Sequence, residues 1–229
     1  MSCMYKITFS INLLFLSFCI LSCGDDDKLT KNEVSKVNDS TASSTVIKTI
    51  VFFGNSLTAG YGLDPAQAFP ALIQKKIDSL NLSYKVINAG VSGETSSGGN
   101  SRVDWILEQP VDVFVLELGA NDGLRGIPIT ETKTNLQSII NKVKAKYPQA
   151  KIVIAGMQMP PNMGQQYTSD FRGIFGELAR KNNSSLIPFI LEGVGGEAGL
   201  NQGDGIHPTT EGHQLVAENV WQELQPLLQ

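Results

Sequence analysis

The sequence has little cysteine, and what it has lies at one end. The chain has 229 residues and three cysteines, Cys3, Cys19 and Cys23. The long remainder after Cys23 therefore has no pair of thiols for a disulfide and no thiolate to bind zinc. Cysteine chemistry is excluded from any domain that follows.

Basic charge is scarce as well. The 18 Lys and Arg residues are outnumbered by 22 Asp and Glu residues, which gives a net charge of −4 and a pI near 5.2. No basic stretch of the kind that follows a phosphate backbone is present, so nucleic acid is excluded as a partner. The hydrophobic fraction of 41% is that of an ordinary soluble domain, and nothing indicates an obligate protein partner.

Only one long apolar run occurs, and it is close to the N-terminus. Ile7–Leu21 follows Lys6 and is too short, and too closely followed by acidic residues, for a stable membrane span. It predicts an export signal over residues 1–22. The end of this run, Ile20-Leu21-Ser22-Cys23, resembles a bacterial lipobox, in which the cysteine becomes the lipidated first residue of the mature protein. The alternative is an ordinary signal peptide with an incidental cysteine.

The segment that follows has the composition of a tether. Residues 23–46 are rich in Asp, Lys, Ser, Thr and Asn and show no sustained apolar period, so they cannot bury enough surface to order themselves. Acyl chains on Cys23 would then hold the domain at the outer membrane, facing the periplasm or the cell surface. The folded domain is expected over residues 47–229.

Within that domain, short β-branched runs alternate with segments of helical period. The runs that predict strands are 46–53, 84–88, 111–118, 151–156 and 185–191, and the predicted helices are 65–80, 101–109, 130–146, 169–182 and 209–224. Strands that are apolar on both faces and joined by helices form parallel sheets covered on both sides. The prediction is an α/β fold, a three-layer αβα sandwich with about five parallel strands and no second domain.

Ligands of such folds bind outside the carboxyl ends of the strands. After the first strand, Ser56 lies on a glycine-rich turn, although serine at such a place more commonly caps a helix. Gly90 follows the second strand and Asn121 the third. Both supply N–H donors of the kind used in oxyanion holes, but both also favour turns for conformational reasons alone.

The two histidines of the chain differ in their surroundings. His207 has a carboxylate, Asp204, three residues earlier, which could orient the ring of a general base. His213 has no acid placed in this way and is expected to be a structural or surface residue. No further residues of zinc-site type accompany Asp204 and His207, so no metal is predicted there.

These blocks resemble the SGNH, or GDSL-type, hydrolases, whose name cites a serine, a glycine, an asparagine and a histidine in this order along the chain. The α/β-hydrolase family requires G-x-S-x-G, whereas this chain has Thr58 at the fifth position. The resemblance covers residues 47–229. Within this family, the chain resembles the bacterial periplasmic acyl-thioesterase, arylesterase and lysophospholipase branch. That resemblance is carried by Gly54–Gly62 and by the segments 119–126 and 156–162.

The resemblance implies a flavodoxin-like fold and a role for each residue of the site. Ser56 would be the nucleophile, His207 the general base and Asp204 the group that orients it. The N–H groups of Ser56 and Gly90 and the side chain of Asn121 would form the oxyanion hole.

One position departs from the family: Asn55 stands where the family name has aspartate. Since this position is outside the triad, catalysis is expected to survive.

The implied reaction is acyl transfer to water through an acyl-Ser56 intermediate, with neither metal nor organic cofactor. The apolar segments Leu124–Pro128 and Met157–Met163 are expected to flank the site, which favours short to medium acyl esters, thioesters and lysophospholipids as substrates. Two alternatives stay open. One is a carbohydrate O-acetylesterase, and the other is a non-catalytic surface lipoprotein that binds acyl or glycan ligands.

Overall fold

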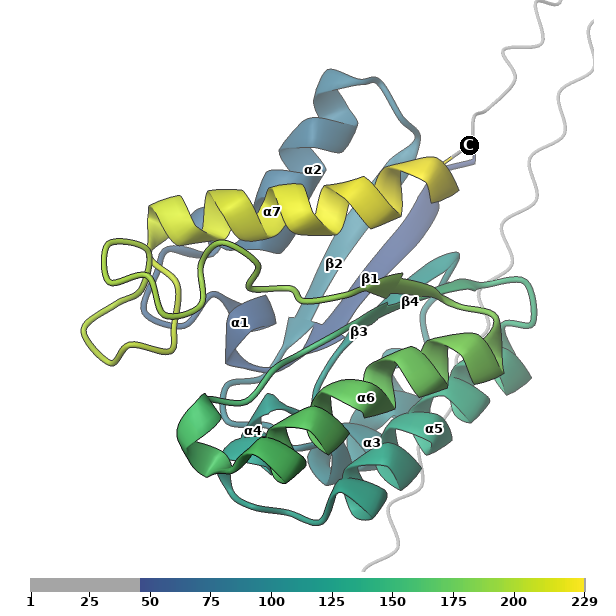
Figure 1. The fold of residues 1–229 in the computed structure, drawn as a ribbon. Coiled ribbons are helices and arrows are strands. Elements are labelled where there is room, and N and C mark those ends of the chain that lie inside the picture. The colour runs from purple at the N-terminus through teal and green to yellow at the C-terminus, as the bar shows by residue number, and fades with distance from the viewer. Residues whose placement is uncertain (1–45, 229) are drawn as a thin grey trace, which may run out of the picture. The chain divides into compact units, whose positions relative to one another are not determined.

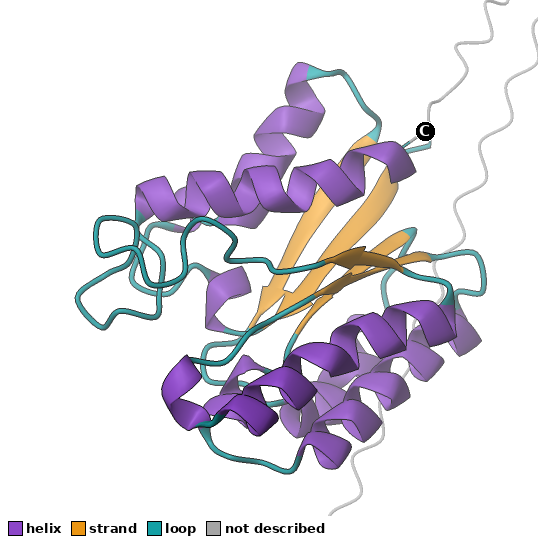
Figure 2. Ribbon diagram, in the orientation of Figure 1, coloured by secondary structure: helices purple, strands orange, loops and turns teal. Residues whose placement is uncertain are grey.

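The computed structural model describes residues 46–228. The expected signal peptide, Cys23 and nearly all of the expected tether lie outside these residues. The described part contains a five-stranded sheet in the order β2-β1-β3-β4-β5, in which every pair of neighbours is parallel. The predicted three-layer α/β fold with about five parallel strands is confirmed (Figures 1 and 2).

The centre of the sheet is formed by its most apolar strands. Phe52, Phe53 and Phe114 of β1 and β3 are fully buried, because helices cover both faces of the sheet. The strands are β1 (Lys48–Gly54), β2 (Tyr84–Gly90), β3 (Val113–Glu117), β4 (Lys151–Ala155) and β5 (Ser185–Ile187).

The helices form two outer layers (Figure 1). One face of the sheet is covered by α2 (Phe69–Ser79) and α7 (Thr210–Leu224), and the other by α3 (Ser96–Ile106), α5 (Ile129–Lys146) and α6 (Gln165–Asn182). Two short helices, α1 (Ser56–Ala59) and α4 (Ala120–Leu124), begin at the carboxyl ends of β1 and β3. The 3₁₀ turns are Pro65–Gln67, Pro161–Met163 and Gln225–Leu227.

Several boundaries differ from the prediction. Helix α3 begins five residues before the expected start at 101, since the Thr95 side chain caps it by accepting a hydrogen bond from the Gly98 N–H at 3.3 Å. Glycines 98 and 99 have no side chains, so the sequence shows no helical apolar period over this first part of α3. The expected helix 65–80 is interrupted at Ala68, whose backbone is extended.

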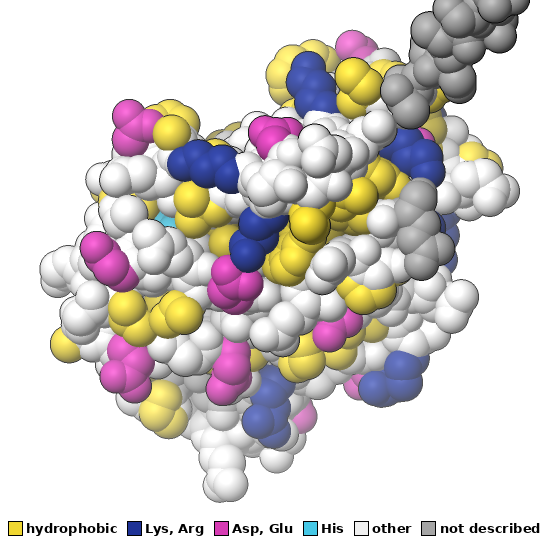
Figure 3. Space-filling model, turned by 90° about the horizontal axis from the view of Figure 1, so that it is seen from above, with side chains coloured by type: hydrophobic (Ala, Val, Ile, Leu, Met, Phe, Trp, Pro, Cys, Tyr) yellow, Lys and Arg dark blue, Asp and Glu magenta, His cyan; other side chains and the backbone are white. Residues whose placement is uncertain are grey.

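The surface mixes charges of both signs. On the face shown in Figure 3, Lys and Arg side chains are interspersed with Asp and Glu. A pair of this kind, Lys76 and Glu218, joins α2 to α7 with an N–O distance of 2.7 Å. Across residues 46–228, no helix has both the length and the apolar character needed to span a bilayer.

Candidate active site at the carboxyl ends of β1 and β3

The order of the strands in the sheet determines where the candidate site lies. Strands β1 and β3 are neighbours, but the chain leaves them toward opposite faces of the sheet, to α2 and α5 respectively. Such a switch point opens a crevice at the carboxyl ends of the two strands. A pocket of about 560 Å³ lies here, and both Ser56, after β1, and Asn121, after β3, line it.

Ser56 occupies the first position of α1. The preceding residue, Asn55, caps this short helix by accepting a hydrogen bond from the Leu57 N–H at 3.0 Å. Gly60, with φ of +74°, ends it after one turn. Ser56 is buried apart from its face toward the pocket, and its Oγ lies 2.9 Å from Nε2 of His207.

His207 and Asp204 lie on the loop before α7. His207 Nδ1 lies 2.7 Å from Asp204 Oδ2, while Asp204 Oδ1 accepts hydrogen bonds from the N–H groups of Ile206 and His207 at 3.0 and 3.1 Å. The hydrogen bond from the His207 side chain, followed by those two, lowers the pKa of Asp204 to about 2. Gly205, with φ of +75°, supplies the turn that brings acid and base together.

Two residues that the sequence did not single out hold this loop. The ring of Tyr61 lies against that of His207, with their centroids 4.6 Å apart. Gln202 donates from its backbone to the His207 carbonyl at 2.7 Å and from its side chain to the Tyr61 carbonyl at 2.8 Å. The base is therefore tied to the segment that follows the serine.

His213 is a buried structural residue in α7. Its side chain is 1% exposed, and Nδ1 accepts a hydrogen bond from the Phe69 N–H at 3.2 Å. Burial, and to a lesser degree the charge of His207, lowers the pKa of His213 to about 4, so this ring is neutral at ordinary pH.

Asn121 brings an amide to the pocket from the first turn of α4. One N–H of its side chain donates to the Glu94 carbonyl at 3.0 Å, which fixes the amide and leaves the second N–H available. The Ser56 N–H is also available, since the first N–H groups of a helix have no intrahelical acceptor. Two N–H donors, one from the Asn121 side chain and one from the backbone of Ser56 itself, are therefore available beside the serine hydroxyl.

Gly90 does not line the pocket, although its N–H was expected to contribute to the oxyanion hole. Its N–H donates to Oδ1 of Asn88 at 3.0 Å, and the described residues that line the pocket include Ser92 and Gly93 but not Gly90. A side chain at position 90 would collide with the backbone of Ala59 in α1. Glycine is needed at the end of β2 for this close approach.

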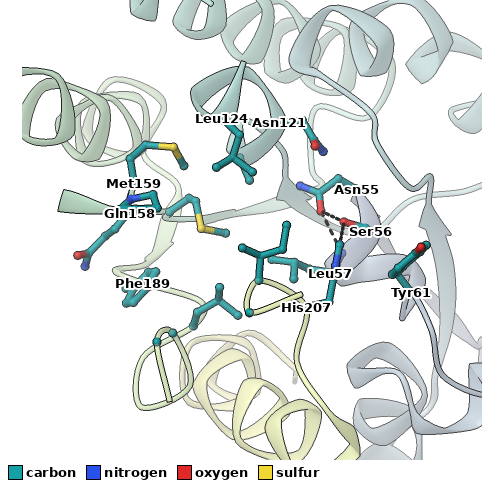
Figure 4. A pocket seen from close by; sticks show the side chains of 18 of the residues that line it. Asn55, Ser56, Leu57, Tyr61, Asn121, Leu124, Gln158, Met159, Phe189 and His207 are labelled. Atoms are coloured by element: carbon teal, nitrogen blue, oxygen red, sulfur yellow. Dashed lines mark hydrogen bonds between the residues drawn. The ribbon is translucent and has the colours of Figure 1, made fainter. Parts of the chain in front are cut away.

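The pocket wall is apolar. Leu124 and Met157–Pro161 line it, as expected for the two flanking segments, whereas the rest of Leu124–Pro128 does not. A further part of the wall comes from the loop after β5, with Phe189, Leu191 and Ile206. Figure 4 shows Leu124, Met159 and Phe189 gathered on one side of the cavity and Asn55, Ser56 and Tyr61 on the other. Phe189 and Leu191 were expected in a strand over 185–191, but β5 ends at Ile187, so the two residues lie in the loop that follows it.

Fold and site together define a class of protein. A serine, a histidine and an aspartate in hydrogen-bond contact, beside free N–H donors and an apolar pocket, form the arrangement found in serine hydrolases. The model of the GDSL-like Lipase/Acylhydrolase family matches residues 52–215. The chain belongs to this family, as the sequence blocks predicted.

Relatives of known function agree with this assignment. The chain is 42% identical to Esterase TesA of Pseudomonas aeruginosa, over 79% of this chain and 90% of that protein. It is 36% identical to Thioesterase 1/protease 1/lysophospholipase L1 of Escherichia coli, over 79% and 85% of the two chains. A crystal structure of TesA superposes with a TM-score of 0.75 and 42% identity, covering 79% of this chain and all of that one. The chain is an esterase of the SGNH type.

Proposed function

We propose that this protein hydrolyses carboxylic esters and thioesters of medium acyl length through an acyl-Ser56 intermediate. One observation carries the proposal: Ser56 Oγ, His207 and Asp204 form a continuous hydrogen-bonded chain, with distances of 2.9 and 2.7 Å, at the edge of an apolar pocket. In this arrangement an imidazole can take the serine proton while the carboxylate stabilises the resulting cation.

The reaction follows in two halves. His207 Nε2 accepts the Ser56 proton as Oγ attacks the acyl carbon, and the proton then passes to the departing alcohol or thiol. Water next donates a proton to His207 as it attacks the acyl-serine, and His207 returns that proton to Ser56 Oγ as the carboxylic acid leaves. Asp204 remains ionised throughout, because its pKa is about 2.

The oxyanion donors proposed for both halves are the Ser56 N–H, the Asn121 side chain and the Gly93 N–H, which replaces that of Gly90. Gly93 lines the pocket with Asn121, and none of the described residues accepts a hydrogen bond from its N–H. Its φ of +79° favours glycine. Each donor of this type contributes about 100-fold or more to the rate.

The shape and chemistry of the pocket support an acyl substrate. Its volume is about 560 Å³, and none of the described residues that line it is Asp, Glu, Lys or Arg. Sugars are bound through many directed hydrogen bonds, whereas a wall of Leu, Met and Phe suits an alkyl chain or an aromatic ring. These features favour acyl esters, thioesters and lysophospholipids over acetylated carbohydrates.

A substrate panel tests this proposal. The purified domain should cleave p-nitrophenyl esters from acetyl to dodecanoyl with the highest kcat/KM at an intermediate length, and acyl-CoA thioesters as well. Ser56→Ala, purified in parallel, controls for contaminating esterases. Acetylated xylan as the preferred substrate would replace the acyl proposal with the carbohydrate esterase, and no turnover of any ester would contradict both.

We also propose that the mature protein is tethered to the outer membrane through a lipidated Cys23. The support is the lipobox-like run Ile20-Leu21-Ser22-Cys23 after an export-type apolar stretch.

A further inference from the structure

A buried carboxylate lies beneath the turn that holds Ser56. Glu117 is the last residue of β3, is 2% exposed, and pairs in register with Gly54 at the end of β1. It is not among the described residues that line the pocket, and the reaction described above does not use it.

Glu117 accepts hydrogen bonds from two residues of the nucleophile turn, Asn55–Thr58. The Asn55 N–H and the Thr58 hydroxyl donate to Oε2 at 3.1 and 2.8 Å, and the Asn55 side-chain amide donates to Oε1 at 2.8 Å. Glycine at position 54 leaves room for this contact, since a Cβ there would lie 2.5 Å from Glu117 Oε2. The carboxylate is thus bound to both ends of the turn.

The Asn55 amide transmits this contact to the serine. Its nitrogen donates to Glu117, while its oxygen accepts from the Leu57 N–H at 3.0 Å and lies 3.4 Å from Ser56 Oγ. Both ends of the amide are used, so its orientation is fixed as long as Glu117 only accepts hydrogen bonds.

We propose that Glu117 is a positioning residue: as an ionised acceptor it fixes the Asn55 amide and the nucleophile turn, and thereby sets Ser56 Oγ against His207. This rests on Ser56 being the nucleophile. Asn55 is the matching partner, because aspartate at this position would bring two buried carboxylates into contact. Burial raises the pKa of Glu117 to about 7, against hydrogen bonds from Thr58 and Asn55 that lower it.

The test exchanges the two groups. In Glu117→Gln, the new amide places an N–H against another hydrogen-bond donor in either orientation of the Asn55 amide. The nucleophile turn should therefore shift, and kcat should fall by roughly tenfold or more while KM stays nearly unchanged. In the double variant Asn55→Asp/Glu117→Gln, the carboxylate and the amide have exchanged places and each donor again meets an acceptor. Much of kcat should return.

Assays at about pH 8 keep Glu117 ionised, with Glu218→Gln, an exposed residue of α7, as the matched control. The rate of fluorophosphonate labelling reports Ser56 reactivity directly and should follow kcat. A Glu117→Gln variant with parental kcat, or a double variant no faster than Glu117→Gln, would overturn the proposal.

A second comparison remains valid even if the Glu117 variants do not fold. Thr58→Ser keeps the hydroxyl that reaches Glu117 and should retain activity, whereas Thr58→Val keeps the shape only and should lose several-fold in kcat. Equal activities of these two variants contradict the role of Glu117. Failure of the parent itself to turn over esters or to be labelled would instead contradict the proposed function.

Discussion

Ser56 and His207, 151 positions apart in the chain, are joined by a contact of 2.9 Å between Oγ and Nε2. The serine comes from the turn after the first strand, and the histidine from the loop before the last helix. The packing of α7 beside α2, on one face of the sheet, brings these two segments together, and contacts of Tyr61 and Gln202 hold the histidine loop against the serine segment. The predictions below test what this contact does.

Ser56→Ala should abolish turnover, because among the described residues Ser56 supplies the hydroxyl that contacts the general base His207. The measurement is the release of p-nitrophenol from p-nitrophenyl acetate, together with labelling by a fluorophosphonate. Activity within about tenfold of the parent, or labelling of the variant, would remove Ser56 from its proposed role.

The two histidines should respond differently to substitution. His207→Ala should lose nearly all kcat/KM, and His213→Ala should keep most of it, since only His207 contacts both Ser56 and an acid. Asp204→Asn should lie near His207→Ala, because an amide favours the wrong tautomer of the ring. The check is kcat/KM of the three variants, with folding verified by circular dichroism. An equal or greater loss at His213 would mean that the base is misplaced.

Asn121→Ala should lower kcat by about 100-fold or more while KM changes little, because its amide is proposed to bind the oxyanion that forms only during the reaction. Asn141→Ala, at an exposed position of α5, is the matched control and should behave as the parent does. The opposite pattern, a raised KM with unchanged kcat, would indicate that Asn121 binds the ground state only.

The free energy of unfolding should depend on pH through His213. Its pKa of about 4 in the folded state lies below the ordinary value of 6.5, so the unfolded chain binds the proton more tightly. This contribution to stability is complete above pH 6.5 and is lost as the pH falls toward 4. Glu117, whose pKa is raised from 4.5 to about 7, acts in the opposite sense, and its stabilising contribution is lost as the pH rises through that range.

A comparison with His213→Gln separates the two effects. Urea unfolding followed by tryptophan fluorescence gives the free energy of unfolding of both proteins across this range of pH. The difference, parent minus variant, should grow by up to about 3 kcal/mol between pH 4 and pH 6.5, the equivalent of the full pKa shift. A difference independent of pH would show that His213 titrates normally.

Cys23→Ser should release the mature protein from membranes, because the variant cannot be acylated. Fractionation of expressing cells, with the parent as control, measures the distribution. An unchanged membrane-bound fraction would contradict a lipid anchor at Cys23.

The fold class and most of the candidate site could be predicted from the order and type of the residues alone. Alternating apolar runs and helical periods require a covered parallel sheet, and in such a sheet residues just after the strands meet at one edge. That geometry is general, so Ser56 and Asn121 could be placed together before any coordinates. The pairing of Asp204 with His207 was equally accessible, because the two are three residues apart on one loop.

The directions of individual backbone and side-chain groups, in contrast, depend on how distant segments pack together. Gly90 ends β2 and Gly93 lies in the loop that follows, and what separates their roles is the direction of an N–H, which depends on local backbone angles that the sequence pattern does not specify. Glu117 lies 62 positions from Asn55, and its contact with the nucleophile turn follows from the register of β1 against β3. The pocket wall after β5 and the burial of His213 likewise result from packing between distant segments, which periodicity along the chain does not encode.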